Sequence, residues 1–320
     1  MKFTALLLTV MLSFQMQAQQ SILNPDRYLN LNYDNDFFSG TDRYYTQGIK
    51  IELIAGIAKK IPSSKILLRL PGTTMNYYGL ALEQDGFTPR SIRKDSIQYG
   101  ERPYCGSFFL SNNLISMNKE MKIRLNTQID LGMIGPAAKG EEEQTAIHKA
   151  IGGLEPLGWQ YQVKNDLILN YRTGVEKGLF SNSYFDLMAI SEAKVGTMYD
   201  DLSGGIFLRL GLKHDYFANL GTSRTYLSKR FADRMQCYVF AKGIAKAVLY
   251  NATLQGGLFS KNDPYTLPAS AIKRGVALAY TGAVLSFGRV KLEYTKAFLS
   301  PEFTKGLSHK WGHCNLSICF

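Results

Sequence analysis

The densest group of polar side chains lies near the start of the chain, in two short runs. The first run is Asp34-Asn35-Asp36-Phe37-Phe38, and the second is Thr41-Asp42-Arg43-Tyr44-Tyr45-Thr46-Gln47-Gly48. Carboxylate, amide and hydroxyl oxygens gathered in one place are the ligands that calcium prefers. Asn35 and Asp36 are therefore candidate metal ligands, and Thr46 would re-enter beside them. An ordinary hairpin loop with side-chain-to-backbone turns would use the same residue types.

A second candidate group lies between residues 135 and 159. Glu141 to Ile151 favours a helix, with acidic residues in its first turn and Gly152-Gly153 as its stop. Gln144 and His148 are four residues apart, so they share a helical face. A short helix inside a long connector is typical of an element that covers a site.

His148 is a candidate general base, because an imidazole can exchange a proton near neutral pH. The alternative is a structural histidine, and the three other histidines compete for the role. We expect His313 to face the interior from a strand and His214 to form a loop pair with Asp215. His309 lies near the start of the same last strand.

Strands must bring these groups together, and side chains that alternate by twos predict strands in many segments. Between Lys122 and Ile134 one face carries Ile123, Leu125, Ile129, Leu131 and Met133, and the other carries Arg124, Asn126, Gln128 and Asp130. A helix would scatter these residues around its circumference. Twelve segments are strand-like: 28–36, 43–55, 77–86, 104–116, 119–135, 158–175, 177–193, 201–213, 235–250, 272–286, 288–299 and 309–320.

The two ends of the chain indicate where this sheet is placed. Residues 1–18 have the pattern of a signal peptide, and no later window of about 18 apolar residues could form a spanning helix. The last strand alternates Cys314, Leu316, Ile318 and Phe320 on one face and ends in the terminal Phe, which resembles the insertion signal of outer-membrane barrels. We therefore expect an all-β protein: a single transmembrane antiparallel β-barrel of about 12 strands over 19–320, with a short loop helix near the site.

An even number of strands lets such a barrel close with both termini in the periplasm. The connectors near 118–120 and Gly288 are expected to be tight periplasmic turns. The longer connectors 56–76, 87–103, 136–157, 214–234 and 258–271 are expected to be extracellular loops. A soluble β-sandwich is the alternative fold, because its strands show the same alternation.

Composition is consistent with a barrel and suggests the partner. The chain has 19 Tyr, 18 Phe and 29 Gly with only 2 Trp, which favours strands and aromatic girdles. The formal net charge is +11. Export argues against nucleic acid, so an anionic glycolipid with phosphate groups is the expected partner, and a merely solvated basic surface is the alternative.

The four cysteines are Cys105, Cys237, Cys314 and Cys319, and their spacing fits no metal site. We interpret them as small wall residues. Cys314 and Cys319 lie on opposite faces of one strand, which argues against a bridge between them. A disulfide to Cys105 or Cys237 stays open in an oxidising compartment.

A set of motifs in order along the chain resembles the lipid A 3'-O-deacylase family of outer-membrane proteins (LpxR-like). The motifs are Asn35-Asp36-Phe37, Thr41 to Gly48, Glu101-Arg102-Pro103-Tyr104, and Gly132-Met133-Ile134-Gly135-Pro136 leading to Gln144, His148 and Trp159. They cover most of the first half of the mature chain, and past about residue 180 only the barrel pattern matches. The resemblance implies a twelve-stranded barrel in the outer membrane of a Gram-negative bacterium, with an active site between the wall and a loop helix near the outer leaflet.

The resemblance also implies an activity. Family members remove the 3'-linked acyloxyacyl chain from the lipid A of lipopolysaccharide, a carboxylic ester hydrolysis that requires Ca²⁺. Position by position, Asn35, Asp36, Thr46 and His148 match active-site residues, and Asn35 and Asp36 are the expected calcium ligands. The expected substrate contacts are Gln144 on the helix, a basic residue at Arg93 or Lys94, and an acidic residue that maps to Leu154 or, after a one-residue shift, Glu155.

The expected chemistry is attack on the ester by water that His148 deprotonates, while calcium polarises the carbonyl. The sequence contains no Gly-x-Ser-x-Gly elbow and no His-x-Ser-Asn-Gly run, which favours water over a serine nucleophile. Two alternatives stay open: a passive porin or structural barrel, and a serine-dependent outer-membrane phospholipase.

Overall fold

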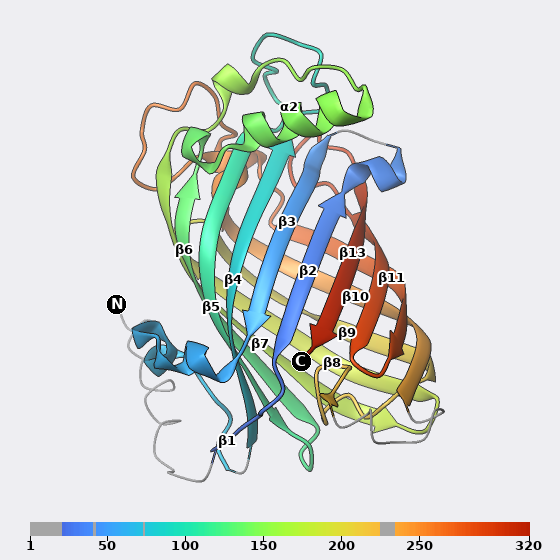
Figure 1. Ribbon diagram of the computed structural model, residues 1–320. Coiled ribbons are helices and arrows are strands. Elements are labelled where there is room, and N and C mark those ends of the chain that lie inside the picture. Colours follow the sequence, from blue (N-terminus) through green and yellow to red (C-terminus); the bar gives the residue numbers. More distant parts are fainter. Residues whose placement is uncertain (1–20, 41–42, 73, 225–233) are drawn as a thin grey trace.

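The computed structural model describes residues 21–40, 43–72, 74–224 and 234–320, and its main feature is a closed antiparallel β-barrel (Figure 1). The expected signal peptide, 1–18, and the motif residues Thr41 and Asp42 lie outside the described residues. No helix within the described ranges is long and apolar enough to cross a membrane.

Twelve strands form the wall, and each pairs antiparallel with its neighbours in the chain. They are β2 (Tyr28–Asn35), β3 (Tyr44–Ile54), β4 (Thr74–Thr88), β5 (Cys105–Asn118), β6 (Ile123–Ile134), β7 (Asp166–Ser181), β8 (Phe185–Gly196), β9 (Tyr199–Leu212), β10 (Met235–Asn251), β11 (Gly275–Phe287), β12 (Val290–Leu299) and β13 (His309–Cys319). The last strand pairs with the first, from Gly312↔Asn35 to Cys319↔Tyr28, and this closes the barrel. The predicted fold class is confirmed.

A short additional strand, β1 (Ser21–Leu23), pairs in parallel with the start of β4. The connectors hold the remaining elements. They are the 3-10 helices η1 (Asp36–Ser39), η2 (Gly56–Lys60), η3 (Pro62–Ile66), η4 (Pro136–Ala138), η5 (Trp159–Tyr161) and η8 (Ala269–Ala271), and the α-helices α2 (Gly140–Ile151) and α3 (Ala252–Gln255).

The two faces of each strand have different surroundings, as the alternation predicts. On β5, Phe108 and Leu110 are exposed on the outside, whereas Ser107, Phe109 and Ser111 are buried inside. His313 faces the lumen, where its Nδ1 donates to Asp34 at 2.8 Å, as expected. All four cysteines are free thiols, which agrees with the absence of a bridge between Cys314 and Cys319.

Two strand predictions need correction. The segment predicted as a strand at 158–175 begins as a strand only at Asp166, because Gly158 adopts a left-handed conformation (φ +103°) and starts the 3-10 turn η5. β7 then continues to Ser181 across a register shift between Gly178 and Phe180. The strand predicted to begin at residue 177 therefore begins at Phe185 instead, in β8.

The expected side of two connectors is wrong as well. Strand direction reverses at each connection, so the connector after β3 lies at the opposite end from the η1 turn after β2. The described residues of these two connectors, 55–72 and 213–224, therefore lie at the end that also carries the turns at 119–122 and 288–289, away from α2 (Figure 1). Connector length alone does not reveal the end at which a connector lies.

Apolar clusters fill the lumen at both ends. At the end away from α2, Tyr28, Tyr77 and Met117 pack with Leu220, and Phe207 and Phe240 pack with Phe217. At the α2 end the clusters contain Phe87, Phe109 and Ile134 on one side, and Tyr44, Val276 and Phe303 on the other. A cavity of about 580 Å³ lies between them, lined by charged side chains that include Glu83, Arg172 and Lys246.

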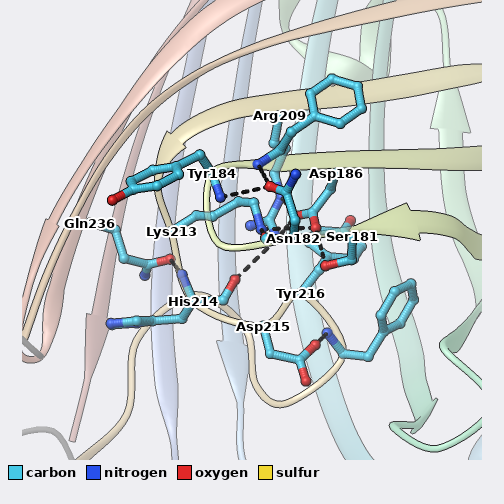
Figure 2. A network of polar contacts seen from close by, with 12 residues as sticks. Ser181, Asn182, Tyr184, Asp186, Arg209, Lys213, His214, Asp215, Tyr216 and Gln236 are labelled. Carbon is cyan, nitrogen blue, oxygen red and sulfur yellow. Dashed lines mark hydrogen bonds and ion pairs between the residues drawn. The ribbon is translucent and has the colours of Figure 1, made fainter.

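Charged side chains hold the connector after β9 against the apolar cluster of Phe207, Phe217 and Phe240 at the end away from α2. Arg209 and Lys213 both donate to buried Asp186, at 2.9 Å, and Ser181 donates to the same carboxylate at 2.6 Å (Figure 2). The guanidiniums of Arg124 and Arg209 lie over the ring of Tyr216, 3.9 and 4.7 Å from its centroid. Tyr216 thereby stays inside the barrel mouth.

This packing predicts that the protein does not conduct like a porin. In planar lipid bilayers we expect no stable ohmic steps, because apolar side chains exclude water and ions at both ends of the lumen. A porin of similar strand number serves as the positive control. Stable open channels of nanosiemens size would contradict the closed lumen.

Candidate active site

The site begins where β2 ends. The side-chain amide oxygen of Asn35 accepts a hydrogen bond from the backbone N–H of Phe37 at 2.8 Å, so Asn35 is the N-cap of η1. Its amide nitrogen donates to the hydroxyl of Tyr33 at 2.9 Å. Both ends of this amide are therefore held, and the turn after β2 has a fixed geometry.

Asp36 follows the cap and is buried, with 2% of its surface exposed. Its carboxylate accepts from the backbone N–H of Arg43 at 2.7 Å and from the Thr46 hydroxyl at 3.3 Å. Thr46 is the extra residue of a register shift in β3, between Tyr45 and Gln47. Such a bulge re-aims side chains, and here it brings the hydroxyl to Asp36.

The site lies on the outer face of the wall. Tyr33 and Asn35 share a face of β2 with Leu31, which is exposed, because they are separated by even numbers of residues. Asp34, between them, faces the lumen and binds His313 and the Tyr45 hydroxyl. The carboxylates of Asp34 and Asp36, two residues apart in one motif, therefore lie on opposite sides of the wall.

Helix α2 lies across the top of β4 and β5 (Figure 1). Two glycines allow this close approach: a Cβ added to Gly140 would lie 2.9 Å from the ring of Trp159 and 3.2 Å from the Cα of Gly106. Gln144 is 1% exposed, and its side-chain oxygen accepts from the Trp159 indole at 2.8 Å. Gln144 thus fixes the helix on the wall and is a positioning residue.

His148 lies one turn beyond Gln144. Its Nδ1 contacts the backbone oxygen of Leu154. A carbonyl oxygen can only accept, so Nδ1 carries the proton and Nε2 is the basic nitrogen of the neutral ring. The segment after the helix is bent back by Gly152 in a left-handed conformation, and the Gly153 N–H bonds to the His148 oxygen at 2.7 Å. This turn brings Leu154 to the imidazole.

A cavity of about 370 Å³ joins these groups. Its lining comes from three regions: Asn35, Asp36, Phe37, Thr46 and Gln47; Arg90, Ser91, Ile92 and Arg93; and Ile147, His148, Gly153 and Leu154. Ile92 is packed against Tyr104 and Trp159, and its backbone oxygen accepts from Leu157 at 2.7 Å. The connector that carries the two arginines is therefore tied to the segment that follows α2.

The structure brings together most of the sequence candidates. Asn35, Asp36, Thr46, Arg93 and His148 line this one cavity. Gln144 lies behind it, against Trp159.

Lys94 and Glu155 are exposed and lie outside the lining. At the position where the resemblance implies an acidic residue, the backbone oxygen of Leu154 contacts His148 instead.

Three residues near the site were not identified from the sequence. Gln47 lines the cavity, although strand alternation would place it among lipid-facing residues. Arg90 lies three residues before Arg93, and the pair of basic residues in one connector was a signal for it. Glu143 lies on α2 beside Gln47, and burial raises its pKa to about 7, an effect that the Gln47 side chain partly offsets.

The donor chemistry at Asn35, Asp36 and Thr46 fits calcium in kind. It comprises a carboxylate and an amide oxygen on the η1 turn and a hydroxyl on β3, all hard oxygen ligands. In the described ranges, no group of three or more His, Cys, Asp or Glu side chains could hold a metal ion. Calcium here would therefore need further oxygens from backbone, water or substrate.

Comparisons with known proteins agree with this architecture. A family model described as "Outer membrane protein LpxR" matches residues 3–320. Among solved structures, LpxR from Salmonella typhimurium is 20% identical, with a TM-score of 0.71 over 92% of this chain and 100% of that one. That likeness shows the same fold.

Two further solved structures match less well. The β-domain of the Bordetella autotransporter BrkA is 8% identical, with a TM-score of 0.43 over 92% of this chain and 97% of that one. The translocator domain of NalP from Neisseria meningitidis is 9% identical, with a TM-score of 0.40 over 100% of this chain and 95% of that one. A search of curated proteins found no match.

Glu143 provides a pH test of the packing of α2. A carboxyl whose pKa is raised in the folded state binds its proton more tightly there, so its contribution is present below the unfolded pKa, near 4.5, and is lost as pH rises through about 7. In the presence of a chelator, Glu143→Gln should raise the urea concentration at the midpoint of unfolding, which Trp159 fluorescence follows. The increase should be larger at pH 8 than at pH 5.

Glu142→Gln is the matched control. Glu142 is exposed and bonds to Lys139 at 2.6 Å, a contact that lowers its pKa, so its substitution should not stabilise the helix at pH 8. Equal effects of Glu143→Gln at both pH values would show that the Glu143 carboxyl is solvated.

Proposed function

The chain belongs to the LpxR family of outer-membrane proteins, and from this premise we propose that it is a lipid A deacylase that hydrolyses the 3'-linked acyloxyacyl ester of lipopolysaccharide. The single observation that carries this proposal is the position of His148. Its imidazole contacts a backbone oxygen and lines the same cavity as Asp36 and Thr46. That cavity lies on the outer face of the wall, at the end away from both described chain ends.

This position matches the place of the proposed substrate. Both described chain ends lie at the end opposite α2, which in an outer-membrane barrel is the periplasmic end (Figure 1). The cavity therefore lies at the level of the outer leaflet, where lipid A is found. A site on the outside of the wall can receive a lipid laterally from the membrane.

The proposed reaction is hydrolysis by water. His148 Nε2 takes a proton from water as the water oxygen attacks the ester carbonyl carbon. The tetrahedral intermediate then breaks its bond to the sugar oxygen, and the proton on His148 passes to that oxygen. The products are a free 3-hydroxyl on the sugar and an acyloxyacyl carboxylic acid. The bond from Nδ1 to Leu154 holds the ring in the tautomer that this step needs.

Calcium is part of the proposal. Asn35 and Asp36 would hold it, with Thr46 adjacent, and when bound it would polarise the ester carbonyl. The protein's own groups prepare this place: Arg43 N–H and the Thr46 hydroxyl orient the buried Asp36 carboxylate. Arg90 and Arg93 line the same cavity, and their positive charges suit the phosphate groups of lipid A.

The porin alternative has no support in the lumen, since apolar clusters occupy both ends. Nothing in the site favours a second function strongly enough to propose one.

Replacing His148 should remove the general base. His148→Ala is expected to lower the rate of acyl release from lipid A by about 10²- to 10⁴-fold, measured by mass spectrometry of the products. The barrel should still fold, because His148 lies at a cavity and not in a core cluster.

His214→Ala and His313→Ala are the controls and should stay near wild type. His313 is bonded to Asp34 in the lumen, and His214 lies in the connector at the far end (Figure 2). A His148→Ala protein with the wild-type rate, or an inactive His214→Ala protein, would place the active site elsewhere.

Metal removal tests the calcium proposal. Chelation should abolish acyl release, and added calcium should restore it. Asp36→Asn keeps the size of the side chain but removes its charge, so it should raise the calcium concentration needed for half-maximal activity, with heat-modifiable mobility unchanged.

Asp34→Asn is the matched control, because Asp34 is adjacent in sequence but faces the lumen. Deacylation that continues at an unchanged rate in chelator would remove calcium from the mechanism while leaving the role of His148 to be judged separately.

A further inference from the structure

The connector between β3 and β4 contains a segment outside the barrel, residues 56–72, which we call the outer segment. It includes η2 and η3 and lies at the end opposite α2, beside the wall (Figure 1). Its position relative to the wall follows from the strand faces that it contacts.

The outer segment packs on outward-facing residues of the wall. Leu114 lies on the same face of β5 as exposed Phe108 and Leu110, yet it is 1% exposed. It is covered by Ala58 and Leu67 of the outer segment, together with Tyr78. The segment therefore occupies wall surface that would otherwise face lipid.

Polar side chains on the outer wall bind the backbone of this segment. The Tyr171 hydroxyl donates to the Ile66 oxygen at 3.0 Å and accepts from the Leu68 N–H at 3.1 Å. The Thr127 hydroxyl donates to the Leu68 oxygen at 3.0 Å, and the Ser116 hydroxyl accepts from the Leu70 N–H at 3.2 Å.

Asn112 completes this set, since its side-chain oxygen accepts from the hydroxyls of Ser63 and Ser64 at 2.8 and 2.9 Å. Irregular backbone at a membrane boundary is tolerated only where its polar groups are satisfied. Three polar residues at outward positions, Tyr171, Thr127 and Ser116, satisfy backbone groups of the segment, and Asn112 binds its hydroxyls, which indicates that the segment is built to lie at the membrane.

The free surface of the outer segment combines apolar and basic side chains. Ile57 is 69% exposed and Ile66 is 62% exposed. The other exposed long side chains are all basic: Lys59, Lys60, Lys65 and Arg69. Residues 56–72 include no Asp or Glu. Within the described part of the chain, the structure gives these four cations no ion-pair partner.

We propose that the outer segment binds anionic glycerophospholipids of the periplasmic leaflet. Apolar and basic side chains on one short interfacial element are the combination that binds an anionic membrane surface. The segment also continues the lipid-facing wall, because Leu53 on β3 and Leu82 on β4, the strands that it connects, are exposed. The four cations would bind phosphate groups, and the two isoleucines would enter the acyl region.

This lipid site is separate from the proposed active site, which lies at the other leaflet. The two can therefore be tested independently. Loss of deacylation would not affect the lipid proposal, and loss of lipid binding would not affect the deacylase proposal.

The first experiment measures lipid retention. Full-length mature protein in detergent is mixed with phosphatidylglycerol or phosphatidylcholine, and bound lipids are counted by native mass spectrometry. The wild type should retain phosphatidylglycerol preferentially. A combined Lys59→Gln, Lys60→Gln, Lys65→Gln, Arg69→Gln variant should bind it at least about tenfold more weakly, since each basic residue near a membrane surface contributes to attraction.

The matched control removes the same charge at the other end of the barrel, with Lys261→Gln, Lys273→Gln, Lys305→Gln and Lys310→Gln, all at exposed residues. It should behave as the wild type. Unchanged binding in the first variant, or an equal loss in both variants, would overturn the proposal.

A second experiment measures how deeply the outer segment enters the membrane, and it does not depend on the charge variants. Ile57→Trp places an indole on the free surface, whereas the native Trp159 and Trp311 are buried. In vesicles of phosphatidylglycerol with brominated acyl chains, the added fluorescence should be quenched. An indole that stays unquenched and emits as in water would show that the segment faces the periplasm and serves a soluble partner, which would also overturn the proposal.

Discussion

The hydrogen-bonded ladder of the closed barrel is the constraint on which the rest of the structure depends. In a membrane each backbone N–H and C=O of the wall needs a partner, so the register of every strand is fixed by its neighbours. The pairing of β13 with β2 closes this ladder at Asn35↔Gly312, within one residue of the candidate metal ligand Asp36. Because side chains alternate, the same register sends Asp34 inward to His313 and Asn35 outward to the cavity. The ladder thus separates a lumen that holds structural charges from an outer face that carries the candidate chemistry.

The candidate site forms where the ladder is interrupted. The N-cap at Asn35 ends β2, and the bulge at Thr46 adds one residue to β3, so an amide, a carboxylate and a hydroxyl meet at the rim. The helix that carries His148 can approach this rim because Gly106 and Gly140 leave no side chain between it and the wall. Trp159 then fills the space beneath the helix and is held by Gln144. Each of these features is a local departure from regular strand geometry, and each one positions a side chain of the candidate site.

The sequence predicts the elements better than their ends, for a physical reason. Alternation is a local property of β2, β3 and β6, so these strands are recognised where they occur. The start of β7 depends instead on Gly158 and on the burial of Trp159 against Tyr104, a contact between distant segments. The positions of Asn35, Asp36 and His148 in one cavity follow from motifs, whereas the contribution of Arg90 and the contact from His148 to a backbone oxygen depend on how two connectors fold. The side on which 56–72 lies required the strand order and could have been derived by alternating direction from the first strand.

The candidate site is divided between residues fixed by the barrel wall and residues carried by connectors, and this division has a consequence for specificity. Asn35, Asp36 and Thr46 belong to the barrel ladder or to turns bonded directly to it, so their relative positions are set by the wall. His148, Arg90 and Arg93 are held by connectors whose main anchors are the cluster of Ile92, Tyr104 and Trp159 and the bond from Leu157 to Ile92. Local opening free energies are lowest where few contacts are buried, so the connectors can adjust to a lipid while the wall cannot. If the proposed function holds, differences among substrates should therefore be sensed by the connector that carries Arg90 and Arg93 and by the segment after α2, while the candidate ligands at the rim keep one geometry for every substrate.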